Sequence, residues 1–196
     1  PEFLIFKETN RSSTAFYIFH HSVCDTNEKY LRFDTTTLQS GAGNVWGNLP
    51  TSSLISIQNG SLNAVSSQNI LYAWHSVPGL QKFGTFTGNG NADGPFIELG
   101  FRPSIVVCKC TAGSNTTQDW QVYDSSRSPI NAVSEGLKWS SSAVKFTGTR
   151  MDFLSNGFKL RASGGAEPNQ SGNTYIYCAW AEQPTSNLFG GQSNAR

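Results

Sequence analysis

The chain has 196 residues, of which 14% are charged and 37% hydrophobic, and its 14 basic residues nearly balance its 13 acidic ones. This length suits one or two domains. The even charge, without a basic block or an acidic tail, argues against nucleic-acid binding. No apolar run approaches the roughly 18 residues of a membrane-spanning helix, so we expect no membrane insertion.

Short runs of β-branched and aromatic residues, bounded by Ser, Asn and Gly, recur along the chain. In chain order they cover residues 3–6, 16–19, 70–74, 105–107, 120–123, 151–154, 158–160 and 175–180. Such runs predict strands, and no long apolar period of 3.6 residues predicts a helix. Ser155-Asn156-Gly157 separates two of the runs. Asn-Gly favours the positive φ angles of a type I′ turn, which predicts a hairpin there.

The sequence also contains an internal repeat. Three segments recur at a spacing of about 106 residues: Leu31-Arg32-Phe33 as Leu137-Lys138-Trp139, Ala73-Trp74 as Ala179-Trp180, and Phe83-Gly84 as Phe189-Gly190. With small gaps, Ile5 aligns with Val107 and Phe16 with Trp120. Repetition at a fixed spacing indicates duplication of a structural unit. We therefore expect the aligned apolar residues to occupy equivalent core sites.

The repeat and the strand pattern together predict an all-β protein of two tandem homologous β-sandwich lobes, jelly-roll-like in arrangement. The expected lobes are residues 1–86 and 103–196, joined by an ordered Gly/Asn-rich connection at 87–102. The chain begins at Pro1, whereas the equivalent Pro103 follows Gly100-Phe101-Arg102. We therefore expect the first lobe to lack a comparable upstream segment. Two explanations stay open: further copies of the repeat precede Pro1, or Pro1 is an ordinary processed N-terminus.

The four cysteines do not resemble a disulfide framework. Cys108 and Cys110 stand two apart in one predicted strand, on the same face, and the first copy has Phe6 and Glu8 at these positions. Two residues so placed cannot comfortably form a disulfide with each other. Buried free thiols are the better interpretation, and they suggest assembly in a reducing cytoplasm.

No catalytic pattern is present. The histidines His20, His21 and His75 lack metal-ligand spacing and do not recur in the second copy, and no G-x-S-x-G, P-loop or Rossmann motif occurs. A glycosidase would need a pair of carboxylates. The candidate pairs are Asp93 with Glu98 and Asp119 with Asp124, and nothing in the sequence brings either pair together. We therefore predict no catalytic residues and no enzymatic activity.

One loop resembles the front of a calcium site. Asn89, Asn91 and Asp93 alternate before Gly94, as do the first ligands of a calcium loop, but the twelfth position is Gly100 instead of Glu. The same residue types also make plain turns. Calcium is the single cofactor considered, and a plain turn remains the simpler interpretation.

Aromatic residues offer a second kind of binding site, because their rings stack on sugars. Trp74 and Trp180 repeat between the copies, which favours a place in the core. Trp46 has no counterpart and lies in the loop Gly43–Asn48, so an exposed ligand contact and packing are equally favoured there. Asn44 and Asn48 flank it and complete the candidate ligand-binding set.

Several segments resemble a known family: Gln81–Gly90, Asp93–Phe96, Gly100–Pro103, Asp152–Arg161, Thr174–Tyr177 and the ending Ser193–Arg196. Over most of its length the chain is similar to a repeat domain of unknown function at the C-terminus of virion structural proteins of tailed bacteriophages, especially marine ones. The Ser/Thr/Asn/Gly-rich polar composition fits such a protein. No catalytic residues come with the resemblance.

The resemblance implies the C-terminal part of a tail fibre or spike that acts in assembly and host-surface adhesion. A capsid decoration or head fibre protein is one alternative, and a depolymerase of cell-surface glycans is another. The implied partners are other virion proteins, a host-surface glycan and further copies of the chain, with a trimer favoured by analogy. The implied location is the virion, assembled in the cytoplasm of the bacterial host.

Overall fold

The computed structural model describes residues 1–10, 15–36, 45–58, 63–114, 119–163 and 168–184. Within these residues the regular elements are strands, which confirms the all-β class. Their bounds are β1 Phe3–Glu8, β2 Tyr17–His20, β3 Leu31–Arg32, β4 Asn69–Trp74, β5 Gln81–Thr87, β6 Phe96–Glu98, β7 Pro103–Ala112, β8 Gln121–Asp124, β9 Val133–Lys138, β10 Phe146–Leu154, β11 Gly157–Leu160 and β12 Thr174–Ala181.

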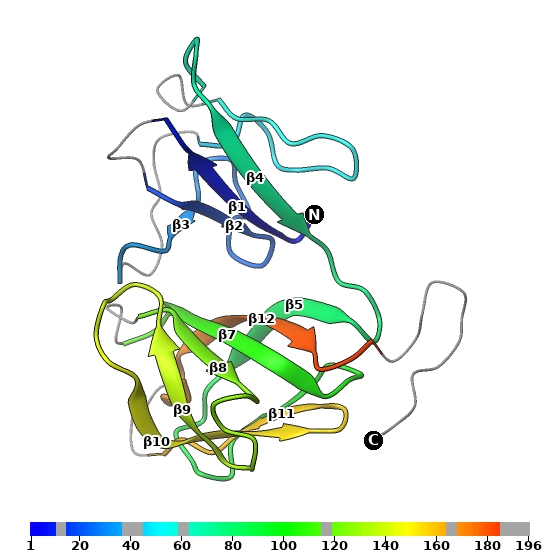
Figure 1. Ribbon diagram of the computed structural model, residues 1–196, viewed down its shortest axis with the longest axis vertical. Helices are drawn as coiled ribbons and strands as arrows, with labels where there is room; N and C mark the ends of the chain where they lie inside the picture. Colours follow the sequence, from blue (N-terminus) through cyan, green and yellow to red (C-terminus); the bar gives the residue numbers. More distant parts are fainter. Residues whose placement is uncertain (11–14, 37–44, 59–62, 115–118, 164–167, 185–196) are drawn as a thin grey trace.

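The strands form two antiparallel sheets (Figure 1). The smaller sheet has four strands in the order β3-β2-β1-β4, and the larger has eight in the order β5-β12-β7-β8-β9-β10-β11-β6. Four neighbouring strands of the larger sheet, β9-β8-β7-β12, thus repeat the order of the smaller one, with each strand replaced by its counterpart in the sequence repeat.

The register of the strands repeats as well. Ile5 stands opposite Ile18 on one side and Tyr72 on the other. Its aligned residue, Val107, stands opposite Val122 and Cys178, which are the residues aligned with those two partners. The duplicated sequence therefore specifies the same pairing twice. The division into two tandem lobes is not confirmed and stays a prediction. β5, which belongs to the expected first lobe, pairs with β12 in the larger sheet.

The two sheets pack face to face, as Figure 1 shows with the smaller sheet above the larger. Side chains alternate between the two faces of a strand. Phe3, Ile18 and Leu31 of the smaller sheet accordingly meet Val107 and Trp120 of the larger sheet in one buried cluster. Burial of each such side chain contributes about 2 kcal/mol. The two copies therefore share a hydrophobic core.

Two further clusters cover the outer faces. On the smaller sheet, Leu4 and Phe6 of β1 and Phe19 of β2 pack against Val45 and Trp46 of the segment that precedes β4. The larger sheet bends over on itself, so that β10 and β11 pack on β7 and β12. The residues of that cluster include Val106, Cys108, Met151, Phe153, Phe158, Leu160, Tyr175 and Tyr177.

The hairpin of β10 and β11 is confirmed, since Leu154 stands opposite Gly157 and Met151 opposite Leu160. The type I′ turn is wrong, because neither Asn156 nor Gly157 has a positive φ angle. Glycine is required at 157 for another reason: a Cβ atom there would lie 2.1 Å from the carbonyl oxygen of Ile97 in β6. The close approach of β6, not the turn, explains this glycine.

Candidate functional site

Trp46 is fully buried, so of the two alternatives that the sequence left open, an exposed contact and packing, the structure shows packing. Its ring packs edge to face on Phe19, with centroids 5.7 Å apart, and its Nε1–H donates to the carbonyl oxygen of Lys29 at 3.1 Å. The packing has a simple cause, because the outer face of the smaller sheet needs an apolar cover. Asn48 is exposed beside it, and Asn44 lies outside the described residues.

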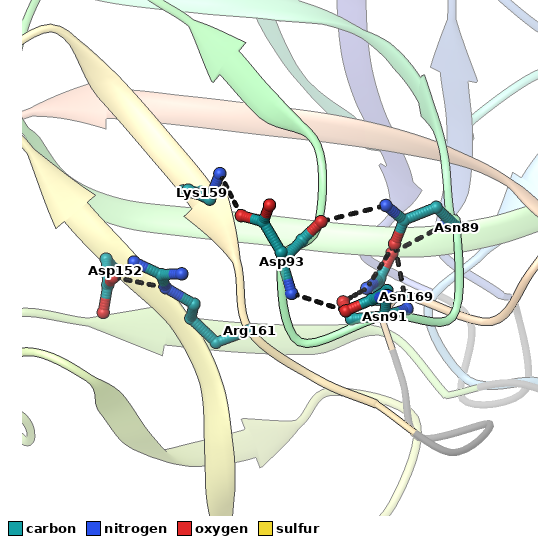
Figure 2. Close-up of polar contacts among 7 residues, drawn as sticks. All are labelled: Asn89, Asn91, Asp93, Asp152, Lys159, Arg161 and Asn169. Carbon is teal, nitrogen blue, oxygen red and sulfur yellow. Dashed lines mark hydrogen bonds and ion pairs between the residues drawn. The ribbon is translucent and has the colours of Figure 1, made fainter.

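The loop of Asn89, Asn91 and Asp93 closes around an amide group (Figure 2). The buried Nδ2 group of Asn169 donates to Asn89 Oδ1 at 3.1 Å and to the Asn91 carbonyl oxygen at 2.8 Å. It also donates to the Ala162 carbonyl oxygen at 2.8 Å, and Asn169 Oδ1 accepts the N–H of Asn89 at 3.0 Å.

The side-chain oxygens of the loop also make its turns. Asn89 Oδ1 accepts the N–H of Asn91 at 3.0 Å, and Asn91 Oδ1 accepts the N–H of Asp93 at 2.9 Å. Successive Asx turns of this kind define the loop locally. The side-chain oxygens of Asn89 and Asn91, two of the three candidate calcium ligands, therefore already accept hydrogen bonds from amide groups.

Ion pairs hold the charged residues beside this loop. The carboxylate of Asp93 lies 2.7 Å from Lys159 Nζ, and this lysine holds the pKa of Asp93 below its ordinary value. Asp152 pairs with Arg161 at 2.6 Å, as Figure 2 shows. Within the described residues, no group of three or more His, Cys, Asp and Glu side chains is placed to hold a metal ion.

The carboxylates considered for glycoside hydrolysis are held in separate contacts. Asp124 pairs with Arg127, and Asp119 pairs with Lys138 at 2.6 Å and accepts a hydrogen bond from Ser140 at 2.9 Å. Partial burial acts to raise the pKa of Asp119, but Lys138 and Ser140 outweigh it and hold that pKa below its ordinary value. A general acid of a glycosidase needs a raised pKa instead.

His20 is buried, and its ring is satisfied in the neutral form. Nδ1 accepts the N–H of Ser22 at 3.3 Å, so Nε2 carries the hydrogen and donates to the Tyr177 carbonyl oxygen at 3.3 Å. Burial lowers the pKa of His20 to about 3. This histidine links the two sheets and does not face solvent.

A groove of about 290 Å³ lies between the end of β4 and the segment after Trp46. Thr51, Ser52, Ser53, Leu54 and Ile55 line one side, and Pro1, Ala73, Trp74 and His75 line the other. The lining includes no carboxylate, so the groove cannot supply the pair of acids that glycoside hydrolysis uses.

An exposed aromatic surface is formed by residues that the sequence analysis predicted to lie in the core. Trp139 is 42% exposed, although its counterpart Phe33 is half-buried and contacts it edge to face at 4.8 Å. Phe16 is also exposed and lies 6.1 Å from Phe33. We call Phe16, Phe33 and Trp139 the aromatic patch. Three serines, Ser140–Ser142, follow Trp139. This polar run is the sequence feature that indicates exposure, and the sequence analysis did not use it.

The residues on either side of Trp139 in the chain are polar. Lys138 pairs with Asp119, and Ser140 donates to the same carboxylate. An exposed indole ring beside fixed hydroxyl and charged groups offers stacking to an apolar face and hydrogen bonds to its substituents. The chemistry suits a sugar ring better than a purely apolar ligand.

A family model described as "Domain of unknown function (DUF7483)" matches residues 1–184. The chain belongs to this family. No curated protein and no solved structure matches the chain. The matched range covers the described parts of both copies of the repeat. It therefore contains the shared core and the candidate sites described above. Within the described residues, no helix is long and apolar enough to cross a membrane.

Proposed function

We propose that this DUF7483 protein is a non-enzymatic structural and adhesion module of a bacteriophage virion, the C-terminal part of a tail fibre or spike. The phage context comes from the resemblance of segments such as Gln81–Gly90 and Asp152–Arg161 to virion repeat domains. The adhesive role comes from the surface, and its ligand is a glycan of the host envelope.

The observation that carries the adhesive role is the exposed ring of Trp139, which lies in the chain between Lys138, paired with Asp119, and the serines that follow. A pyranose ring presents C–H groups on one face and hydroxyls around its rim. The indole face can stack on the C–H groups, and the hydroxyl, ammonium and carboxylate groups can form hydrogen bonds with the hydroxyls of the rim.

Binding at one such site is weak. With 14 basic and 13 acidic residues, the chain has little net field to steer a charged polysaccharide. Affinity per site then comes from stacking and a few hydrogen bonds. Many copies on one particle, or a homotrimer as the family analogy favours, supply avidity without new contacts.

A glycan depolymerase is the second candidate, and the geometry favours it less. Hydrolysis needs two carboxyl groups about 5–10 Å apart on either side of the scissile bond, one of them with a raised pKa. Asp119 is the carboxylate paired with the neighbour of Trp139 in the chain, but Lys138 and Ser140 stabilise its charged form. The site is therefore suited to holding a sugar and not to protonating a leaving group.

The test passes host envelope polysaccharide over the immobilised chain and follows both retention and polysaccharide length. Trp139→Ser removes the exposed ring, and Phe96→Ser, at another residue that is 43% exposed, is the matched control. We expect the parent and the Phe96 variant to retain the polysaccharide and the Trp139 variant to lose at least tenfold in retention. Shortened polysaccharide would refute the non-enzymatic role, and equal retention by both variants would refute the site.

A capsid decoration or head fibre protein would display the same surface from a different place on the particle. A density map of the intact virion separates these assignments, because the 21.3 kDa chain would appear either at the tip of the tail or on the capsid. Light scattering of the purified chain gives the number of copies in the assembly.

A further inference from the structure

The groove between the end of β4 and the segment after Trp46 shares no lining residue with the aromatic patch. Its volume of about 290 Å³ is close to the lower end for small-molecule pockets, about 300 Å³. A cavity of this size suits a small ligand or a short stretch of a longer one. Both of its walls are held in place by hydrogen bonds of the protein itself.

The first wall is a turn that Thr51 closes. Thr51 Oγ1 accepts the N–H of Ser53 at 3.3 Å and that of Leu54 at 3.0 Å, and the N–H of Thr51 donates to the Leu54 carbonyl oxygen at 2.9 Å. A threonine hydroxyl bonded to the backbone two and three residues on fixes a turn locally. Ile55, next in the chain, packs on the outer face of the smaller sheet. The turn therefore presents the exposed residues Ser52 and Ser53 from a defined backbone.

The second wall is the end of β4 and the residue that follows it. The Trp74 carbonyl oxygen accepts the N–H of Glu2 at 2.7 Å, and the His75 carbonyl oxygen accepts a hydrogen bond from Gln81 Nε2 at 2.8 Å. The imidazole Nδ1 of His75 lies 2.9 Å from the carbonyl oxygen of Ser76. Because a carbonyl oxygen only accepts, Nδ1 carries the hydrogen, and Nε2 of the neutral ring offers a lone pair.

Both walls supply polar groups that can bind a ligand, and apolar groups stand among them. The hydroxyls of Ser52 and Ser53 can donate and accept hydrogen bonds, whereas Nε2 of His75 accepts. Leu54, which is 58% exposed, adds apolar surface on the first wall, and Ala73 adds it on the second. A purely apolar ligand would displace water from the polar groups and give them no hydrogen bond in return.

The lining offers no counter-charge either. Among the described residues that line the groove, none is Asp, Glu, Lys or Arg. Glu2, the chain neighbour of Pro1, already accepts hydrogen bonds from the N–H and the hydroxyl of Ser76. Removal of an ionised group from water without a partner charge is unfavourable. The lining therefore fits an uncharged ligand that carries both hydroxyl groups and an apolar surface.

We infer that this groove is a second carbohydrate site and that it selects neutral sugars. A neutral pyranose presents hydroxyls around its rim and C–H groups on its faces. Ser52, Ser53 and Nε2 of His75 bind the hydroxyls, and Leu54 and Ala73 contact the C–H groups. The ligand class follows from the lining of the groove and not from Trp139, so this site and the adhesive site proposed above can fail separately.

An NMR titration of the full chain tests the ligand class. Oligosaccharides released from host envelope polysaccharide are separated by anion exchange into a neutral and an acidic fraction, which serve as the two probes. The neutral fraction should shift the amide signals of Ser52, Ser53 and His75, and the acidic fraction at equal sugar concentration should bind there at least fivefold more weakly. Unshifted signals with the neutral fraction, or tighter binding of the acidic one, would overturn the inference.

Variants then test the place of binding. Ser53→Arg puts a long charged side chain at the groove and should weaken binding of the neutral fraction at least tenfold. Leu54→Ser, which removes apolar surface, should act in the same direction. Ser155→Arg, at an exposed serine of the turn between β10 and β11, is the matched control and should bind as the parent does.

The same titration with Trp139→Ser separates the two sites. We expect the shifts at Ser52 and His75 to persist in this variant, because it leaves the groove intact. Parent-like binding by both Ser53→Arg and Leu54→Ser would overturn the groove and leave the site at Trp139 standing. Shifts that disappear only in Trp139→Ser would overturn it as well, since the sugar would then bind at the aromatic patch.

Discussion

Trp74 and Trp180 meet edge to face between the sheets, with ring centroids 6.2 Å apart and planes inclined by 76°. They occupy equivalent places in the two copies, and each is partly buried at the C-terminal end of its strand. Each ring thus supports the other copy as well as its own.

Alanine substitution of either tryptophan should lower the free energy of unfolding by about 3 kcal/mol, because a large ring leaves a shared core. The two losses should not add, and a double-mutant cycle in urea should give a coupling of about 1 kcal/mol. Trp74→Ala combined with Trp139→Ala is the control, since these rings belong to separate contacts. Parent-like unfolding of Trp74→Ala would contradict a supporting role.

Asn169→Ala should destabilise the protein by about 3 kcal/mol, because it leaves Asn89 Oδ1 and the carbonyl oxygens of Asn91 and Ala162 without their buried donor. Thermal unfolding measures the loss, with Asn156→Ala at an exposed position as the control. A loss no larger than that of the control would show that the loop holds its own shape.

Calcium at millimolar concentration should leave the melting temperature of the parent unchanged, since the oxygens of Asn89 and Asn91 already accept hydrogen bonds. A ligand that binds the folded state raises that temperature. A calcium-dependent rise that EDTA reverses, and that Asp93→Asn abolishes, would establish an ion site in place of the amide-filled loop.

Acid should destabilise the protein through His20. Its pKa is lowered by burial from 6.5 to about 3 in the folded state, so the unfolded chain binds the proton first. Stability should therefore fall as the pH drops from about 6 toward 3, with a slope from this residue of about 1.4 kcal/mol per pH unit. His20→Gln should flatten the profile in that window and exposed His75→Gln should not, as urea unfolding at several pH values would show.

The thiols should react slowly in the folded protein. Cys24, Cys108, Cys110 and Cys178 are all free and buried, as the sequence predicted. Burial raises the pKa of Cys24 to about 12 and that of Cys178 well above its ordinary value, so the reactive thiolate is scarce. In denaturant, all four thiols should react rapidly with an aromatic disulfide reagent, whereas in the folded protein the reaction should be slow. Rapid native modification of Cys24 would contradict its burial.

The local pattern of the sequence predicted runs within β1, β2, β4, β7, β8, β10, β11 and β12, but not β3, β5, β6 or β9 and not the order of strands in the sheets. Ile5 and Val107 are aligned by the repeat, and each stands between aligned neighbours. The burial of the aligned residues did not follow. Phe16 is 40% exposed, whereas its counterpart Trp120 is fully buried, contacts Phe33 edge to face at 5.0 Å and donates to the carbonyl oxygen of Arg32.

Trp46 and Gly157 show two further limits of sequence reasoning. Loop composition made Trp46 a candidate for the surface, but the outer face of β1 and β2 needed an apolar cover that no local pattern reveals. The turn signal at Asn156-Gly157 predicted the right hairpin for the wrong reason, since the glycine admits a strand 60 residues earlier in the chain. Both errors concern contacts between distant segments.

The shared core also determines how late in translation the chain can fold. When the first 86 residues have emerged, Phe3, Ile18 and Leu31 still face the place of strands that have not been made, and β5 has no β12 to pair with. Native contacts of such long sequence separation form late and slowly. The nascent chain must therefore stay unaggregated until residue 181 is synthesised, and chaperone dependence during translation is the expected cost of building the two copies against each other.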